Sequence, residues 1–354
     1  RPRRSNALRD GRYEFRDVAY LLVKKSKHKR LLTKEEIGLN ITVKEALRRL
    51  PRKALMSIVA ELRQLVEMGT WLPVDKKQLT GKQLRKIIRS SMFLKEKYLS
   101  TGEFEKLKAR LVAGGHMQDR SVYAENERSS PTVSSDSVQM VAHIAAIEGR
   151  KVKTCDITAA YLNAMIKNAE VLMRLDPTIA GILAELYPEY QGYLNPDGTL
   201  VVKLRRALYG CVESAKLWYD LLRKTLESMG FVRNRKDMCV FNLGSGDKQC
   251  TVCFHVDDLM ITCTDDKIID DVITRLQDEF QTITVHDGPK FSYLGMSIDF
   301  SESKKVKITM EKYIDDVIKD TGTTKAASSP ARDNLFEIDP DSPRLGKQDR
   351  EYFH

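Results

Sequence analysis

The sequence is poor in cysteine and tryptophan, and it has no long apolar run. It contains six cysteines and two tryptophans in 354 residues. No stretch approaches the roughly 18 uninterrupted apolar residues of a membrane span, which argues against a membrane protein. The first residues are basic and lack the apolar core of a signal peptide. We therefore expect an intracellular protein with no membrane partner.

The few cysteines lie mostly in apolar, strand-like runs, which favours reduced and buried thiols over a disulfide framework. Cys250 and Cys253 have the spacing of half a zinc site. No second cysteine pair and no nearby pair of histidines completes such a site, so we do not expect zinc. The sequence also has no internal repeat and no long low-complexity segment.

Acidic residues are outnumbered by basic ones. There are 59 Lys and Arg residues and 49 Asp and Glu residues, a formal net charge of +10. Such a charge suits a polyanionic partner, although many soluble basic proteins have none. Basic residues concentrate in 1–4, 24–30 and 76–115. We interpret residues 1–50 as a basic extension that is either a solvated tail or a nucleic-acid contact.

Apolar residues recur at helical spacing in four segments that carry cap or stop residues. The predicted helices are 51–71 with a stop at Gly69, 134–149, 207–230, and one that Asp265 or Asp266 caps. Strands are predicted at 91–94 and 108–114, joined through 100–102 as a basic hairpin, and at 151–157, 171–175, 238–243, 250–256 and 259–263. We interpret 177–198, which Pro, Gly and Asn interrupt, as an irregular excursion.

From Val152 onward the predicted order is strand, helix, strands, helix, strand. This order is typical of a ferredoxin-like sheet with helices on one face, so the predicted fold class is α+β.

Asp257 and Asp258 follow a β-branched and aromatic run and precede another one. We expect a hairpin with both acids at its tip. Pleating aims neighbouring side chains in different directions, so only one acid is certain to reach a shared metal. Asp156, at the end of a neighbouring strand, would lie near enough to share that cation. Taken alone, the dipeptide is more often a solvated Asp-Asp turn.

Carboxylates that converge on one sheet edge can hold Mg²⁺, which prefers oxygen ligands. Two such ions about 3.5–4 Å apart can activate a 3′-hydroxyl and stabilise a leaving pyrophosphate. We expect Asp156 and Asp257 to be the metal-ligand pair and Asp258 a supporting acid. Lys108 and Arg110 would neutralise a triphosphate, or would form a charged solvent face.

Seven segments follow one another in a familiar order and spacing. They are Ala54-Leu-Met56 to Thr70-Trp71, Lys108-Ala-Arg-Leu-Val-Ala-Gly114, Ser130-Pro-Thr-Val133, Asp156-Ile-Thr-Ala-Ala-Tyr-Leu162, Leu208-Tyr-Gly210 with Leu217-Trp-Tyr219, the Val-Asp-Asp hairpin, and Tyr293-Leu-Gly-Met296. Together they resemble the reverse transcriptase of copia-type (Pseudoviridae-like) long-terminal-repeat retrotransposons, from about Pro51 onward.

The resemblance implies an α+β right-hand polymerase with fingers, palm and thumb. The implied bounds are 51–131 and 163–206 for the fingers, 132–162 and 207–300 for the palm, and 301–354 for the start of a thumb or connection. The implied enzyme is an RNA-directed DNA polymerase that extends a primer on RNA or DNA from dNTPs with two Mg²⁺ ions, for which Mn²⁺ substitutes. We expect a piece of a polyprotein, cut short before RNase H, with RNase H and integrase parts as partners. The implied location is the cytoplasm, in a virus-like particle, or the nucleus.

The resemblance also assigns roles to residues. Asp156, Asp257 and Asp258 become the catalytic and metal-binding acids, with the Ile157 carbonyl as a further ligand. Tyr161 falls on the position that blocks a ribose 2′-hydroxyl, with a core tyrosine as the alternative. The implied nucleotide-binding residues are Lys108, Arg110, Tyr161, Tyr209 and Gly210. The implied primer contacts are His255, Tyr293, Leu294, Gly295 and Met296.

The chain departs from the family in two places. His255 stands where the family usually has Tyr. After Gly210 the family commonly has Leu-Lys-Gln-Ala-Pro-Arg, whereas residues 211–216 here lose a Lys and gain Glu213. All three aspartates are present, so we expect activity. The alternatives are a non-catalytic nucleic-acid-binding protein derived from such an element, and another palm-type nucleotidyl transferase such as a primase or cyclase.

Overall fold

The computed structural model describes residues 41–98, 104–167 and 169–321, together with isolated positions beyond Thr321. The chain divides into two units, Arg1–Ile308 and Thr309–His354. Most of the predicted basic extension and the turn predicted at 100–102 lie outside the described residues. None of the helices within the described ranges is long and apolar enough to span a membrane.

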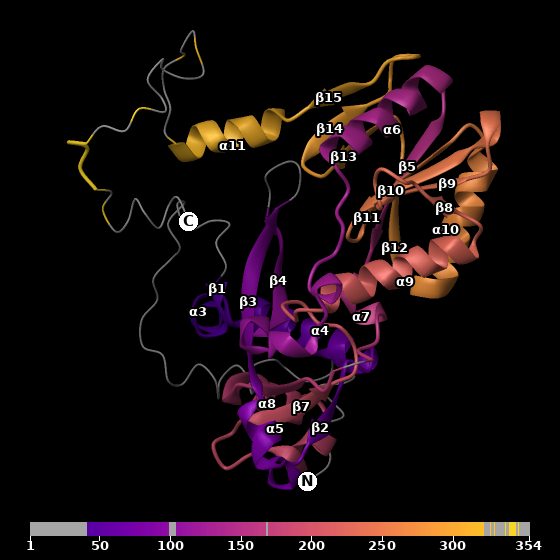
Figure 1. Ribbon diagram of the computed structural model, residues 1–354. Coiled ribbons are helices and arrows are strands. Elements are labelled where there is room, and N and C mark those ends of the chain that lie inside the picture. The colour runs from indigo at the N-terminus through magenta and orange to yellow at the C-terminus, as the bar shows by residue number, and fades with distance from the viewer. Residues whose placement is uncertain are drawn as a thin grey trace. The chain divides into compact units, whose positions relative to one another are not determined.

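Six strands of the first unit form one sheet (Figure 1). Its strands are β1 Ile41–Thr42, β2 Trp71–Val74, β3 Ile88–Tyr98, β4 Phe104–Ala113, β6 Leu172–Leu175 and β7 Leu200–Leu204, in the order β1-β3-β6-β7-β2 with β4 paired to β3. The helices associated with it are α3 Val43–Arg49, α4 Pro51–Glu67, α5 Gly81–Arg85 and α8 Pro177–Leu186. Apolar side chains of α4 and α8 share one buried core with these strands.

The predicted excursion at 177–198 is wrong, because it contains the buried helix α8 and the 3₁₀ helix η6 Pro188–Tyr193. Asp176 caps α8, since its carboxylate accepts from the amides of Thr178 and Ile179 at 2.9 and 3.1 Å. Pro177 occupies the first turn, where a helix needs no amide donor. The Pro begins this helix instead of breaking it.

A second six-stranded sheet has the order β12-β5-β11-β10-β9-β8, with all neighbours antiparallel. Its strands are β5 Lys151–Ile157, β8 Val232–Arg233, β9 Val240–Leu243, β10 Cys250–His255, β11 Asp258–Cys263 and β12 Ile283–Asp287. Helix α9 Ser214–Ser228 lies between β5 and β10 in the chain, and α10 Asp266–Phe280 connects β11 to β12. A smaller sheet contains β13 Lys290–Tyr293, β14 Met296–Asp299 and β15 Lys307–Thr309.

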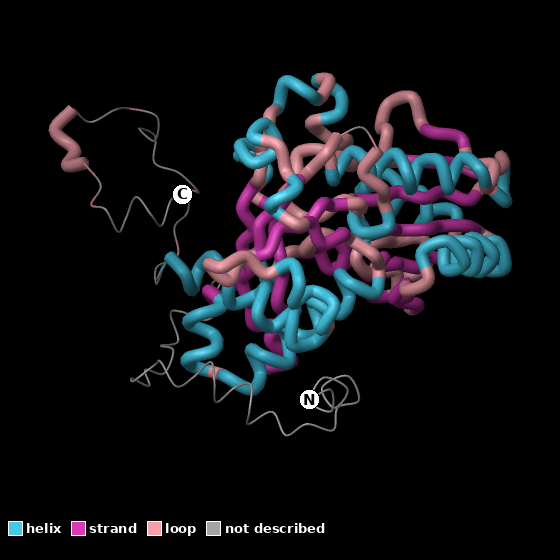
Figure 2. Tube along the Cα trace, turned by 90° about the horizontal axis from the view of Figure 1, so that it is seen from below, coloured by secondary structure: helices cyan, strands magenta, loops and turns pink. Residues whose placement is uncertain are grey.

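Helices lie on both faces of the second sheet, and Figure 2 shows strands between helical layers in this part of the chain. Helix α9 contacts one face, where the rings of Tyr219 and Phe254 lie 6.0 Å apart. Helix α6, Ser135–Glu148, lies on the other face, because its Val141 lines a cavity with Thr251 and Thr262. The prediction of helices on one face did not include α6.

Other predicted elements are confirmed, with shifted ends. Helix α4 ends before Gly69, α6 begins after its Ser134 cap, and Asp265 caps α10. The helix predicted at 207–230 begins only at Ser214, because the residues before it form a loop with Gly210 at φ +89°. In the second unit, α11 Glu311–Thr321 exposes its apolar side chains.

Candidate active site

The β10–β11 hairpin ends in a two-residue turn, Val256-Asp257, because His255 pairs with Asp258. The hairpin prediction is confirmed, but only Asp257 lies in the turn, and Asp258 is the first residue of β11. Val256 has φ +59°. Glycine is favoured at such a position, and a β-branched residue there is strained. Strained backbone of this kind persists only where the surrounding structure holds it.

Three successive carbonyls around this turn each accept a hydrogen bond. The indole Nε1 of Trp218 donates to the carbonyl of Val256 at 2.7 Å. The amide of Ile157 donates to the carbonyl of Asp257 at 3.1 Å. The hydroxyl of Tyr293 contacts the carbonyl of Asp258 at 3.3 Å. Contacts from α9, β5 and β13 therefore hold the turn.

Asp156 lies directly opposite Asp258 in the register of β5 and β11. Residues paired across two strands project from the same face, and like charges placed opposite each other are destabilising. Burial raises the pKa of Asp257, and the Asp156 carboxylate raises it further. Burial also raises the pKa of Asp258, with added contributions from Asp257 and Asp156. The structure thus brings the three predicted acids together at one end of the sheet.

The donor chemistry at these acids fits a hard divalent cation. Among the residues that the structure describes, no three His, Cys, Asp or Glu side chains are grouped closely enough to hold a metal by themselves. Mg²⁺ needs only one or two protein carboxylates, because waters and substrate phosphates fill its other positions. A cation would also relieve the repulsion between the acids. The Ile157 carbonyl, one residue after Asp156, stays a predicted ligand.

Three of the predicted nucleotide-binding residues form one cluster near these acids. The guanidinium carbon of Arg110, on β4, lies 4.2 Å from the centre of the Tyr209 ring. The rings of Tyr209 and Tyr161 lie 4.6 Å apart at 57°, and Tyr161 belongs to α7 Ala160–Asn163. Burial raises the pKa of Tyr209 to about 12, Arg110 opposes this rise, and the charge of Asp257 adds to it. This cluster of Arg110, Tyr209 and Tyr161 therefore lies within electrostatic reach of Asp257.

Gly210 fixes the loop that carries Tyr209. A Cβ on Gly210 would lie 2.2 Å from the Ala113 carbonyl oxygen, closer than any side chain allows. The Ala113 amide donates to the Tyr209 carbonyl at 2.7 Å. Gly115, which the site prediction missed, allows the same close packing of the loop against β4, since a Cβ added to it would lie 1.9 Å from the Gly210 oxygen. Its signal was the Gly114-Gly115 pair after a strand.

Lys108 and Glu61 lie outside this cluster. Lys108 is exposed on β4, two residues from Arg110 and so on the same side of the strand. Glu61, also missed by the prediction, accepts from the Leu111 amide at 2.9 Å. Burial raises the pKa of Glu61, while the Leu111 amide, Arg110 and Lys108 oppose the rise. Glu61 therefore supports the strand that carries Arg110, and the triphosphate role of Lys108 stays a prediction.

The predicted primer segment is a tight turn between β13 and β14, with Tyr293 paired to Met296. Leu294 and Gly295 both have positive φ, +50° and +79°. Tyr293 is only 3% exposed. Its hydroxyl contacts carbonyls of the β10–β11 hairpin. Its side chain therefore points inward, which disagrees with a direct primer contact by its ring. Primer contact stays a prediction for the other four residues, Leu294, Gly295, Met296 and the half-buried His255.

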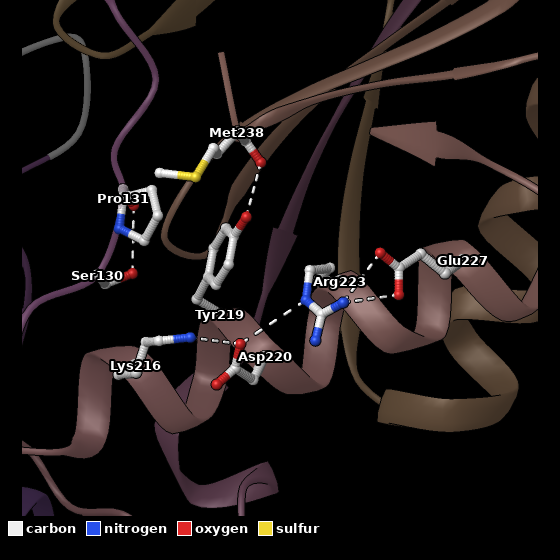
Figure 3. A network of polar contacts seen from close by, with 8 residues as sticks. All are labelled: Ser130, Pro131, Lys216, Tyr219, Asp220, Arg223, Glu227 and Met238. Atoms are coloured by element: carbon white, nitrogen blue, oxygen red, sulfur yellow. Dashed lines mark hydrogen bonds and ion pairs between the residues drawn. The ribbon is translucent and has the colours of Figure 1, made fainter. Parts of the chain in front are cut away.

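The altered stretch 211–216 turns its added charge inward. Glu213 is 5% exposed, and its Oε2 accepts from the Gln118 amide nitrogen at 3.1 Å. Lys216 pairs with Asp220 at 2.6 Å on α9, beside Arg223 and Glu227 (Figure 3). Glu213 therefore adds no exposed negative charge to this surface.

The six cysteines are reduced and buried, as predicted. Cys250 and Cys253 are three residues apart on β10, so they project from opposite faces of the strand. They do not form half of a metal site.

Comparisons with known proteins agree with this geometry. A family model described as reverse transcriptase (RNA-dependent DNA polymerase) matches residues 80–331. The retrovirus-related Pol polyprotein from transposon RE1 of Arabidopsis thaliana is 30% identical over 243 residues, which cover 66% of this chain and 15% of the relative. The transposon Ty1-DR1 Gag-Pol polyprotein of Saccharomyces cerevisiae is 27% identical over 287 residues, 78% of this chain and 14% of the relative. The chain thus spans about 15% of the length of these relatives. It belongs to the reverse transcriptase (RNA-dependent DNA polymerase) family, and its resemblance to the copia-type members is confirmed.

Proposed function

We propose that the chain is an RNA-directed DNA polymerase that extends a primer on an RNA or DNA template from deoxynucleoside triphosphates. The observation that carries the proposal is the pairing of Asp156 with Asp258 in register, with Asp257 in the adjoining turn. Family membership supports the same reaction class. The relatives' names as Pol and Gag-Pol polyproteins support other parts of a polyprotein as neighbours, and RNase H and integrase parts stay a prediction.

Asp156, Asp257 and Asp258 would hold two Mg²⁺ ions, with Mn²⁺ as a substitute and the Ile157 carbonyl as a further ligand. When bound, such ions would activate the primer 3′-hydroxyl and neutralise charge on the leaving pyrophosphate. Arg110 would bind triphosphate oxygens through its guanidinium. Tyr161 would occupy the space of a ribose 2′-hydroxyl and so select deoxynucleotides.

We assign the second sheet, with α6, α9 and α10, to the palm. The order β12-β5-β11-β10, with α9 and α10 as the connecting helices, supports a ferredoxin-like topology. The first sheet and its helices would then form the fingers, and α11 would begin the thumb. The residue bounds given for these parts stay predictions.

Primer extension on an RNA template with Mg²⁺ or Mn²⁺ tests the proposal. We expect the wild-type chain to extend the primer and Asp257→Asn to lose roughly a thousandfold, because a metal ligand contributes several kcal/mol to the transition state. Asp247→Asn, the same change at an exposed acid in the β9–β10 connection, is the matched control and should keep wild-type activity. A wild-type rate no higher than that of Asp257→Asn contradicts the proposal.

A further inference from the structure

We propose that Trp218 is a positioning residue for Asp257, acting through the carbonyl of Val256. The inference rests on the proposed polymerase function, because it concerns the acid that would bind the metal. Trp218 itself is 1% exposed and does not belong to the cluster of Arg110, Tyr209 and Tyr161.

A contact outside the turn fixes the orientation of the Trp218 indole. It belongs to α9, and its ring centre lies 5.1 Å from that of Phe280 in an edge-to-face contact. Edge-to-face pairs hold aromatic rings in a defined orientation. The ring that carries the Nε1–H group is therefore held in one orientation while this group donates to the Val256 carbonyl at 2.7 Å.

The peptide between Val256 and Asp257 is the part of the chain that this hydrogen bond orients. A peptide unit is planar, so fixing the Val256 oxygen also fixes the nitrogen and Cα of Asp257. The φ of +59° at Val256 is unfavourable for a β-branched residue, so local preference alone does not keep this geometry.

Asp257 is held on both sides. Trp218 fixes the peptide that precedes it, and the Ile157 amide binds its own carbonyl at 3.1 Å. Because Ile157 follows Asp156 in β5, the second contact ties Asp257 to the strand of the other acid. Loss of the indole donor would free the peptide that precedes Asp257 and leave the hydrogen bond from the Ile157 amide in place.

Two changes at Trp218 remove the donor. Trp218→Phe keeps an aromatic ring, and replacement of Trp218 by β-(3-benzothienyl)alanine keeps the bicyclic shape without the N–H group. Tyr219→Phe is the matched control. Tyr219 is the next residue of α9 and is 3% exposed. Its hydroxyl donates to the Met238 carbonyl at 2.9 Å and not to a carbonyl of the turn (Figure 3).

Two measurements are made on each protein. The first is Mn²⁺ affinity without nucleic acid, by electron paramagnetic resonance. The second is kcat and KM for addition of one nucleotide to a primer. Partners that orient a metal ligand typically change metal affinity or activity by about 10- to 100-fold. We expect both Trp218 variants to bind Mn²⁺ roughly tenfold more weakly and to lose a similar factor in kcat, with KM within about twofold of wild type.

Tyr219→Phe should match the wild type in both measurements. Wild-type Mn²⁺ affinity in the benzothienyl variant, or equal losses in Tyr219→Phe, overturns the positioning role. Mn²⁺ binding without primer extension by the wild type overturns the proposed function, while the Mn²⁺ affinities still decide the role of Trp218. A wild-type chain that binds no Mn²⁺ overturns both.

Discussion

The guanidinium of Arg110 lies over the ring of Tyr209, 4.2 Å from its centre. Arg110 comes from a strand of the first sheet, and Tyr209 from the loop that precedes α9. The contact places a fixed positive charge beside Tyr161 and within electrostatic reach of Asp257. In the proposed enzyme, this is where an incoming triphosphate would meet the metal-binding acids.

Arg110→Gln should raise KM for the nucleotide by roughly 10- to 100-fold, since a charge-assisted hydrogen bond contributes about 1.5–3 kcal/mol. Steady-state kinetics with one dNTP measures this. Arg85→Gln, on the short helix α5, removes the same charge and should leave KM unchanged. Equal KM values for Arg110→Gln and the wild type would remove Arg110 from nucleotide binding.

Tyr161→Ala should admit ribonucleotides far more readily, by roughly 100-fold in the ratio of kcat/KM values, because the ring no longer fills the space of the 2′-hydroxyl. Tyr161→Phe keeps the ring and should keep the discrimination. Competition between dNTP and NTP in primer extension measures the ratio. Unchanged sugar discrimination in Tyr161→Ala would favour the alternative of a packing tyrosine.

Gly210→Ala should lower the free energy of unfolding by about 1–3 kcal/mol, because the new Cβ meets backbone atoms at a residue with φ +89°. Gly181→Ala is the control. Gly181 lies inside α8 with open space around it, so alanine there should stabilise by about 0.5–1 kcal/mol. Urea unfolding measures both, and a neutral Gly210→Ala would disprove the tight docking of its loop on β4.

The raised pKa values of Asp257 and Asp258 predict how the metal-free chain responds to pH. An unfolded Asp has a pKa of about 3.9. Between that value and the raised folded values, the folded state binds more protons, so stability falls as pH rises through this window. Asp258→Asn should reduce the fall. Thermal unfolding across this pH range measures it, and a slope identical in wild type and variant would show that the pKa of Asp258 is not raised in the folded chain.

Much of this site could be predicted from sequence because its signals are local. The Asp-Asp pair between two β-branched runs predicted the hairpin, and Asp156 at the end of an alternating run predicted the neighbouring strand. The placement of Asp258 within β11 could not be predicted, since one residue of register depends on the whole sheet. Roles taken from the resemblance named Arg110, Tyr161 and Tyr209 but did not show that they contact one another.

The misses have a common physical cause, which is that tertiary contacts override local signals. Pro177 and Gly181 looked like breaks, but Asp176 caps the helix and the core covers its apolar face. The sequence placed Trp218 in a segment of the family resemblance but did not show its contact, because a hydrogen bond to a carbonyl 38 residues away leaves no trace in sequence spacing. The inward turn of Tyr293 likewise depends on the hairpin that its hydroxyl contacts.

The most direct test of the account is the rate of Mg²⁺-dependent single-nucleotide addition on an RNA template by the wild type and by Asp156→Asn. Asp156 is about a hundred residues from Asp257 in sequence, and the fold places it opposite Asp258 and within electrostatic reach of Asp257. If the acids share one metal site, Asp156→Asn should retain the fold and lose roughly a thousandfold in rate, as expected for Asp257→Asn. A wild-type rate in the folded Asp156→Asn variant would contradict the shared site.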